Sequence, residues 1–368
     1  MLKGKITINT EAIERFFKPR TPAVVGADIS SSSVKLVELV DAGGGSYRVE
    51  HYAVEPLPRD AVVDGNINNL EAVSDALRRC HKRLGSHVKN LAMAVPNNAV
   101  ISKTILVPAG QTEDELELQV ETEANQYIPF VLDEVNLDFQ VLGPAPNSAE
   151  DVEVLIAASR KEKIDDRVAV AEAAGLKAMV MDVDLFAAQA AFELMRKQFP
   201  EGGKDQNIAI VDVGATMMHV NVLRNGQSIY TREQPFGGSQ LTQEIVNKFG
   251  LTPEEAETAK RMGGLPENYD SDVLQPFLDM LSLEVARALQ FFYTSTQHNQ
   301  VDHIVLSGGC AGLPGVAEAV SKRVEVHTVI ANPFSDMAVS GKVKPKNLTQ
   351  DAPMLMVACG LALRRFDK

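Results

Sequence analysis

Two aspartates occupy matching positions in the two halves of the chain. Asp28 ends a short apolar run and precedes four consecutive serines, whereas Asp212 ends a second apolar run and precedes a Val-Gly-Ala-Thr turn. A carboxylate beside exposed backbone N–H groups and hydroxyls can order the waters of Mg²⁺ while the turn binds phosphate oxygens. The pair therefore predicts two phosphate-binding turns that face each other across a cleft.

Each aspartate begins the same local pattern. After Asp28, the segments 34–40 and 47–54 alternate as strands and are separated by three glycines; after Asp212, the segments 217–223 and 228–233 do the same around Asn225-Gly226. One such copy would be an ordinary hairpin with an acidic turn, but two copies favour paired binding turns. A Rossmann site is disfavoured, because both turns lead into strands where that site needs a helix.

A third turn fits the same scheme. The strand-like run 301–306 is followed by Ser307-Gly308-Gly309-Cys310, and a helix is expected from Leu313-Pro314 onward. A glycine pair after a strand lets a flat ligand approach the backbone closely. A plain tight turn between a strand and a helix remains an equal alternative.

Composition limits the class of protein. The 368 residues carry a formal charge of −13, which disfavours nucleic acid as the main partner. The three cysteines are far apart and indicate reduced thiols in the cytoplasm. The apolar run 352–363 is shorter than the ~20 residues of a spanning helix and predicts a buried helix. Residues 1–20 lack a signal-peptide core, so we expect an N-terminal arm, with a weak membrane-surface helix as the alternative.

The three turns, in this order, resemble the phosphate-1, phosphate-2 and adenosine motifs of the actin/Hsp70/hexokinase superfamily. Residues 181–187 resemble its connect-1 segment, and Pro353–Leu363 resembles connect-2. Residues 236–260 are similar to the part of FtsA-like proteins that contacts the nucleoside. The resemblance implies an α/β, actin-like ATPase fold with two lobes of ribonuclease-H-like βββαβα type.

Within this superfamily, the chain resembles the PilM family of type IV pilus assembly. The serine-rich turn after Asp28 ends in Val34-Lys35 as in that family, although Ser30 stands where actin and Hsp70 have glycine. A capping box at Thr112–Glu115 opens a helix, and strands are expected at 135–142 and 152–158. They predict an inserted α+β subdomain, the 1C subdomain shared by FtsA and PilM proteins.

The resemblance also implies a division of the chain. We expect an arm at 1–21, subdomain 1A at 22–106 and 184–205, the inserted 1C subdomain at 107–183, subdomain 2A at 206–240 and 300–368 with a C-terminal helix returning to the hinge, and subdomain 2B at 241–299.

The implied ligand is MgATP in the cleft, with Asp28 and Asp212 holding the water shell of the metal. Asp184, and after it Asp182, is the candidate to orient the attacking water. Either aspartate could instead cap the helix that follows, Lys35 could lie on an edge strand, and Glu257 and Lys260 could be a surface i,i+3 pair. The implied ATP contacts are Ser31, Ser32, Ser33, Lys35, Gly214, Ala215, Thr216, Gly238, Glu257, Lys260, Gly308, Gly309 and Cys310.

The family resemblance further implies a partner. PilM proteins bind the N-terminal cytoplasmic tail of PilN in a groove of subdomains 1A and 1C, and Pro129-Phe130 lies in that part of the chain. We expect a cytoplasmic protein that is peripheral to the inner membrane, has at most slow ATPase activity, and contacts pilus motor ATPases or copies of itself. The alternatives are a filament-forming ATPase like FtsA, disfavoured because few residues follow Leu363, and a small-molecule kinase, for which we find no substrate-binding constellation.

Overall fold

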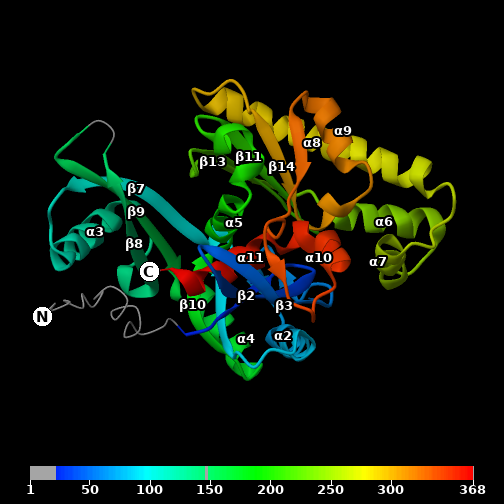
Figure 1. The fold of residues 1–368 in the computed structure, drawn as a ribbon, viewed down its shortest axis with the longest axis horizontal. Coiled ribbons are helices and arrows are strands. Elements are labelled where there is room, and N and C mark those ends of the chain that lie inside the picture. The colour runs from blue at the N-terminus through cyan, green and yellow to red at the C-terminus, as the bar shows by residue number, and fades with distance from the viewer. Residues whose placement is uncertain (1–21, 146–147, 368) are drawn as a thin grey trace, which may run out of the picture.

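The computed structural model describes residues 22–145 and 148–367 (Figure 1). The expected N-terminal arm at 1–21 lies outside these residues. The described chain folds into two lobes, each built on one large sheet, and a smaller inserted subdomain stands beside the first lobe.

The first lobe contains a six-stranded sheet with the order β10-β6-β1-β2-β3-β16. β1, β2 and β3 form an antiparallel meander, and β6 and β10 run parallel to β1. The much later β16 pairs with β3. The strands are β1 (Val25–Ile29), β2 (Ser33–Gly43), β3 (Ser46–Pro56), β6 (Asn90–Val95), β10 (Lys177–Val183) and β16 (Ala338–Val339).

The second lobe repeats this arrangement in a five-stranded sheet with the order β13-β12-β11-β14-β15. Its first three strands again form an antiparallel meander, and β14 and β15 run parallel to β11. The predicted repeat of two meanders is therefore confirmed. The strands are β11 (Asn207–Val213), β12 (Met218–Arg224), β13 (Gln227–Gln234), β14 (His303–Ser307) and β15 (His327–Ile330).

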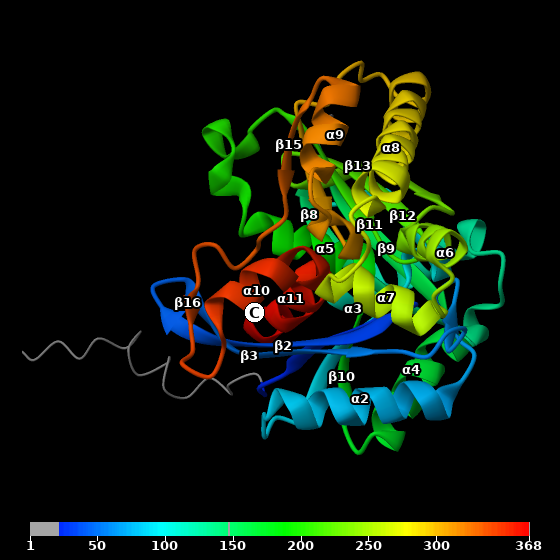
Figure 2. The same cartoon turned by 90° about the vertical axis from the view of Figure 1, so that its right-hand side faces the viewer.

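Helices cover both sheets. In the first lobe, α2 and α4 lie on one face of the sheet and α11 on the other (Figure 2). In the second lobe, α6 to α9 cover the outer face. None of the helices in the two described ranges is long and apolar enough to cross a membrane. The helices are α2 (Leu70–Leu84), α4 (Lys161–Ala173), α5 (Asp184–Glu193), α6 (Gly238–Phe249), α7 (Pro253–Met262), α8 (Gln275–Ser295), α9 (Val316–Val324), α10 (Pro345–Asp351) and α11 (Met356–Leu363).

Helices α5 and α11 lie between the two sheets and join the lobes. Their apolar side chains share one buried cluster with residues of β2 and of β11. The approach is close, because a Cβ on Gly26 of β1 would clash with the α11 backbone, and one on Gly360 of α11 would clash with α5. The apolar run near the C-terminus is therefore a buried helix, as predicted from its length.

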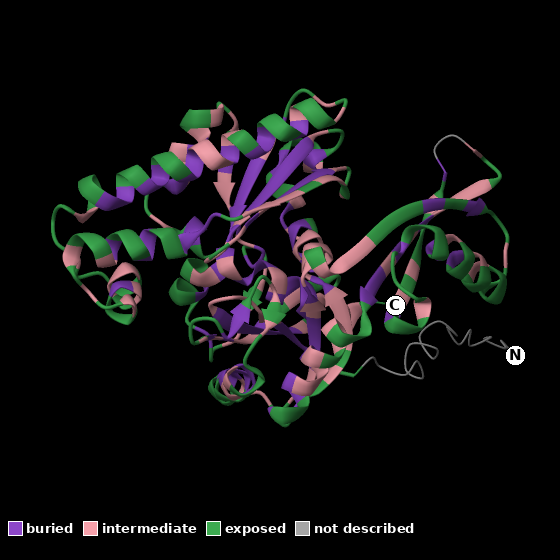
Figure 3. Cartoon of the chain, turned by 180° about the vertical axis from the view of Figure 1, so that it is seen from behind, coloured by how far each residue is buried: buried purple, intermediate pink, exposed green. Residues whose placement is uncertain are grey.

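The inserted subdomain has a three-stranded sheet of its own, with the order β7-β9-β8. Helix α3 packs on one face over a small core that contains Val107, Val120 and Ile156. The predicted capping box is present, since Thr112 and Glu115 bond reciprocally at the start of α3. Many residues of β7 and α3 are exposed (Figure 3). The elements are β7 (Val100–Pro108), α3 (Glu113–Tyr127), β8 (Val135–Pro144) and β9 (Asp151–Arg160).

The expected subdomain limits cross sheet boundaries at two places. The range 107–183 includes α4 and β10, which pack on and pair within the first-lobe sheet. The range 300–368 includes β16 and α11, which also contact that sheet. The sequence pattern shows that a segment is a strand or a helix, but its sheet is decided by tertiary contacts. A hairpin of β4 (Val62–Val63) and β5 (Asn66–Ile67) completes the first lobe.

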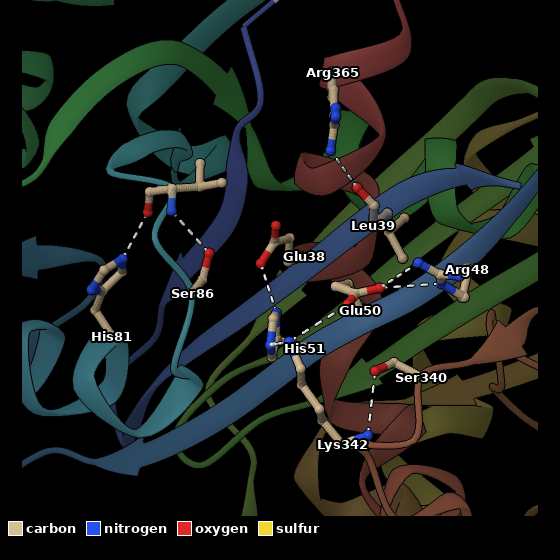
Figure 4. A network of polar contacts seen from close by, with 11 residues as sticks. Glu38, Leu39, Arg48, Glu50, His51, His81, Ser86, Ser340, Lys342 and Arg365 are labelled. Atoms are coloured by element: carbon tan, nitrogen blue, oxygen red, sulfur yellow. Dashed lines mark hydrogen bonds and ion pairs between the residues drawn. The ribbon is translucent and has the colours of Figure 1, made fainter.

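A polar network fastens the C-terminal segment to the first-lobe meander (Figure 4). His51 on β3 lies 2.9 Å from Glu38 on β2 through Nδ1, and 3.2 Å from Lys342 through Nε2. Arg365 donates to the carbonyl of Leu39 at 3.0 Å. Two distant parts of the sequence are thus held on the same meander.

Candidate functional site

A cavity of about 270 Å³ lies between the lobes, where the two meanders face each other. Both acidic turns and the glycine turn after β14 contribute to its wall. Helix α5 and the loop after β6 close it on the first-lobe side. Of the residues singled out in the sequence, Asp28, Ser31, Ser32, Ser33, Lys35, Asp184, Asp212, Gly214, Thr216, Gly308 and Gly309 line this cavity.

In the first hairpin, the acid and a base form a direct pair. Asp28 and Lys35 are opposite each other in the β1–β2 register. Lys35 Nζ donates to Asp28 Oδ2 and to Ser30 Oγ, each at 2.8 Å. Lys35 is buried and lines the cavity, so the alternative of a surface lysine on an edge strand is wrong. Ser30, the first of the four serines after Asp28, supplies a second acceptor for this lysine.

In the second hairpin, the acid has no direct cationic partner among the residues that the structure describes. Asp212 accepts a hydrogen bond from Ser307 Oγ at 2.9 Å. Burial raises the pKa of the Asp212 carboxyl, although nearby His219 lowers it. His219 lies opposite Asp212 in the β11–β12 register, as Lys35 lies opposite Asp28. A partly buried carboxylate of this kind is stabilised by a cation that enters the cavity.

His219 belongs to a polar chain that joins the lobes. Its Nδ1 lies 3.4 Å from Glu233 Oε1, and Asn97 Nδ2 donates to the same oxygen at 3.4 Å. The backbone N–H of Asn97 donates to Asp184 Oδ1 at 2.9 Å. Burial disfavours the charged imidazole, but the bond to Glu233 and the charges of Asp212 and Asp184 raise the pKa of His219 to about 9.

The two candidate catalytic aspartates have different surroundings. Asp184 lines the cavity, and burial raises its pKa to about 7. Its Oδ1 accepts from Leu185 N and Asn97 N, so this oxygen fixes the loop after β6 as well as the first residue of α5. Asp182 does not line the cavity and forms an ion pair with Arg364 at 2.6 Å. Of the two aspartates, Asp184 alone is therefore placed to act on a ligand in the cavity.

The glycine turn after β14 lies against the second hairpin. Gly308 has a φ of 85°, and a Cβ there would collide with the backbone of Val213. Its N–H donates to the carbonyl of Pro353 at 2.9 Å, which anchors the turn to the segment before α11. Gly309 begins a 3₁₀ turn and leaves the backbone open toward the cavity.

The remaining candidates lie behind the cavity wall. Gly238 N donates to Gly214 O at 3.0 Å, and Cys310 Sγ lies 3.5 Å from the same oxygen. Lys260 Nζ contacts Glu257 Oε2 at 2.6 Å, the i,i+3 pair that was the alternative for these residues, and it also contacts Gly238 O at 3.4 Å. Lys260 borders a second cavity, of about 280 Å³. Ala215, Gly238, Glu257, Lys260 and Cys310 do not line the main cavity.

Several cavity residues were not identified from the sequence. His219 could have been found, because it follows Asp212 by the same seven positions that separate Lys35 from Asp28. Arg167 and Asn97 belong to no sequence motif, and they line the cavity only because the tertiary fold brings them there. In the described part of the chain, no group of three or more acidic, histidine or cysteine side chains could enclose a metal directly.

Comparisons with known proteins agree with the geometry. The family model for the type IV pilus assembly protein PilM matches residues 26–366. A solved structure of a PilM–PilN type IV pilus biogenesis complex is similar over 95% of this chain and 100% of that chain, with 30% identity and a TM-score of 0.77. The predicted actin-like, two-lobed fold is confirmed.

Two further similarities are more distant. The structure of the ethanolamine utilization protein EutJ from Carboxydothermus hydrogenoformans is similar over 95% of this chain and 93% of that one, with 17% identity and a TM-score of 0.53. The cell division protein FtsA of Escherichia coli (strain K12) is 21% identical over 362 residues, which cover 85% of this chain and 84% of FtsA. Both are matched less well in sequence than the pilus protein.

Proposed function

This chain belongs to the PilM family of type IV pilus assembly proteins, and we propose that it binds MgATP in the interlobe cavity and the N-terminal cytoplasmic tail of PilN on its first lobe and insertion. The observation that carries the proposal is the full-length similarity, at 30% identity, to a structure of a PilM–PilN complex. That similarity includes the inserted subdomain as well as both lobes, since it covers 95% of the chain.

The nucleotide part of the proposal is supported by two hairpins that close on one space. Thr216 Oγ1 of the second hairpin lies 3.4 Å from Ser31 Oγ of the first, so a ligand between them touches both lobes. Asp28 and Asp212 would order the waters of the metal, and the serine and glycine turns would bind phosphate oxygens. The Mg²⁺ of bound MgATP would supply the positive charge that is missing beside Asp212. The ATP would supply a transferable terminal phosphate.

Thermal-shift titration with MgATP tests this site. A ligand that binds only the folded state raises the melting temperature as its concentration rises. We expect a clear shift for the wild type and a lost or much smaller shift for Asp28→Asn and Asp212→Asn. The matched control is Asp182→Asn, which removes a carboxylate that is 10% exposed and does not line the cavity. Shifts of wild-type size in both cavity variants would contradict the site.

We propose that hydrolysis at this site is slow at most and secondary to nucleotide binding. Asp184 already uses Oδ1 to hold two backbone N–H groups, which leaves Oδ2 to orient a water or accept its proton. Burial raises the pKa of Asp184 to about 7, in the range where a carboxylate can accept a proton near neutral pH. The main role that we propose for the nucleotide is to hold the lobes closed, because a ligand that touches both hairpins favours the closed form.

The partner surface is proposed on the inserted subdomain and the adjoining first lobe. More than half of the large exposed hydrophobic side chains among the described residues lie in this insertion, although it is a small part of the chain. A concentration of large exposed hydrophobic side chains in one small subdomain is typical of a protein interface. These side chains are Leu106, Leu118, Tyr127, Phe130, Val131, Val141 and Leu142.

Calorimetry with a PilN tail peptide tests this surface. Leu118→Glu and Val131→Glu replace the two most exposed of these side chains, at 66% and 64% exposure, and should weaken tail binding at least tenfold if they line the groove. Met262→Glu, at 82% exposure on α7 of the second lobe, is the matched control and should bind normally. Equal binding by all three variants would place the tail elsewhere.

This tail would also set the location of the protein. We propose that the chain lies at the inner membrane through PilN, so it should co-sediment with membranes only when PilN is co-expressed. Sedimentation with bare liposomes would instead assign an anchoring role to the N-terminal arm. Contacts with pilus motor ATPases and with a second copy of the chain remain predictions.

A further inference from the structure

Arg167 is a buried cation that belongs to neither of the two hairpins of the cavity. It lies on α4, is only 3% exposed, and lines the interlobe cavity. Its guanidinium donates to three main-chain carbonyls: Nε to Ala94 O at 2.7 Å, Nη1 to Lys163 O at 2.9 Å and Nη2 to Gly65 O at 2.8 Å. Within the described ranges, no carboxylate forms an ion pair with it.

In this arrangement the charge of the Arg167 guanidinium is not neutralised, and some of its N–H donors have no acceptor among the described residues. Carbonyl dipoles orient a guanidinium but do not cancel a full buried charge, which favours an anionic partner. Burial lowers the pKa of Arg167, while the nearby charge of Asp184 raises it. Arginine has five N–H donors, so one N–H on each terminal nitrogen has no partner among the described residues.

The position fits the phosphate end of the cavity. Ala94, which accepts from Nε, follows the residue of β6 that pairs with Ala27, so it lies beside the Asp28 end of β1. The glycine turn at Gly308, proposed for the nucleoside, belongs to the opposite lobe. A nucleotide bound in that orientation extends its phosphates toward the first lobe and Arg167.

We propose that Arg167 is a phosphate-binding residue of the cavity, whose remaining N–H groups take oxygens of the terminal phosphate of a nucleoside triphosphate. The inference rests on the proposed nucleotide site and adds a preference to it. A guanidinium binds two oxygens of one phosphate with fixed geometry, whereas a lysine acts as a point charge. Arg167 therefore distinguishes a triphosphate from a diphosphate.

The same contact would connect the cavity to the insertion. Helix α4 begins directly after β9, the central strand of the inserted sheet. Four residues before Arg167, Lys163 Nζ donates to Asn66 Oδ1 at 2.8 Å, so this turn of α4 is already tied to the β4–β5 hairpin. A phosphate bound by Arg167 would restrain the start of α4 and the end of β9 together.

The test compares the affinities of the β,γ-imido analogue of ATP and of ADP within each variant, by calorimetry with Mg²⁺. The ratio of two affinities in one protein cancels a general loss of folding. The wild type should prefer the analogue, and Arg167→Gln and Arg167→Lys should each reduce that preference by about tenfold or more, the size of a lost charged hydrogen bond. Lys163→Met removes a neighbouring cation of α4 that does not line the cavity, and should leave the ratio unchanged.

The outcomes are distinct. If the wild type binds neither nucleotide, the proposed cavity function fails, and the inference fails with it. If the wild type binds both but shows no preference, or if Arg167→Gln weakens both equally, the nucleotide site stands and the role of Arg167 is overturned. Hydrogen exchange of residues 151–173 gives a second readout: the analogue should slow exchange there in the wild type and in Lys163→Met, and unchanged exchange in the wild type would refute the link to the insertion.

Discussion

The two acidic hairpins have the same backbone arrangement but differ in how the charge of the aspartate is balanced. In both, an aspartate at the end of the first strand is opposite a basic residue that follows it by seven positions. The first hairpin neutralises itself, because Lys35 bonds directly to Asp28. The second does not, because His219 contacts Glu233, while Asp212 has a hydroxyl as its hydrogen-bond partner.

This difference indicates which half of the cavity depends on a ligand and on the other lobe. The charge of the first hairpin is balanced within two strands. In the second hairpin, His219 contacts Glu233, and Glu233 accepts a hydrogen bond from the side chain of Asn97. The backbone N–H of Asn97 in turn donates to Asp184 of the first lobe. We therefore expect the structure of the first hairpin to be the same with and without a ligand. The second hairpin should respond to nucleotide, to pH and to lobe closure.

The largest effect should come from breaking the first pair. Asp28→Asn leaves Lys35 as a buried cation without its partner, which should lower the free energy of unfolding by about 3 kcal/mol. Asp212→Asn should be neutral or stabilising in the absence of nucleotide, because burial already raises the pKa of this carboxyl and so disfavours its charge. Denaturant unfolding of both variants measures the contrast.

A double variant completes this comparison. Asp28→Asn combined with Lys35→Met removes both charges and should recover most of the stability lost by the single change. Equal losses for Asp28→Asn and Asp212→Asn would show that the two hairpins are balanced alike.

The second prediction is a pH dependence specific to the second hairpin. The pKa of His219 is raised from 6.5 to about 9 in the folded protein, so its protonation stabilises the fold fully below pH 6.5 and this contribution is lost as the pH rises to about 9. The His219 side chain is about a third exposed, so solvent screening should limit this contribution to the order of 1 kcal/mol. Subtracting the stability of His219→Gln from that of the wild type at each pH should give a difference that falls over this window. A flat difference would mean that the histidine is neutral in the folded state.

The comparison of hairpins also shows what the sequence could predict. Asp28 and Asp212 were found because each ends an apolar strand before a turn of small residues, a pattern that local chemistry determines. The repeat of this pattern predicted two similar sheets, and the sheet orders confirm it. Aligning the two hairpins would have added His219 as the counterpart of Lys35.

Other residues could not be found in this way. Arg167 reaches the cavity from α4, and its partners are main-chain carbonyls, which any sequence can supply. Asp182 and Asp184 lie close in sequence, but β10 ends and α5 begins between them, so one side chain meets Arg364 and the other meets the cavity. The sheet that α4 and β10 join likewise depends on contacts distant in sequence.

The third prediction separates turnover from partner binding. Asp184→Asn keeps the two backbone bonds through its amide oxygen and should leave PilN tail binding within twofold of wild type, while it removes any hydrolysis. Asp212→Asn should weaken MgATP binding and, if tail and nucleotide both favour the closed lobes, weaken the tail by about fivefold in the presence of MgATP. Calorimetry of the tail peptide with and without MgATP measures both. Loss of tail binding in Asp184→Asn, with ATP still bound, would make turnover part of the function.

In the wild type, hydrolysis itself should depend on the ionisation of Asp184. Since the pKa of this carboxyl is raised to about 7, the rate should rise with pH through that value. A rate that is constant from pH 6 to 8 would assign the proton-accepting step to another group.

The smallest effect concerns the contact between the hairpin tips. Ser31 Oγ and Thr216 Oγ1 are 3.4 Å apart in an exposed part of the cavity, so their mutual contact competes with water and should contribute under about 1 kcal/mol. Ser31→Ala and Thr216→Val should therefore change the unfolding free energy little and additively without nucleotide. With MgATP, both hydroxyls would serve one phosphate group, and the effects of the two changes on affinity should no longer add. A double-mutant cycle measured in both states decides the matter: additivity in both would mean that the hairpins do not bind the same part of a ligand.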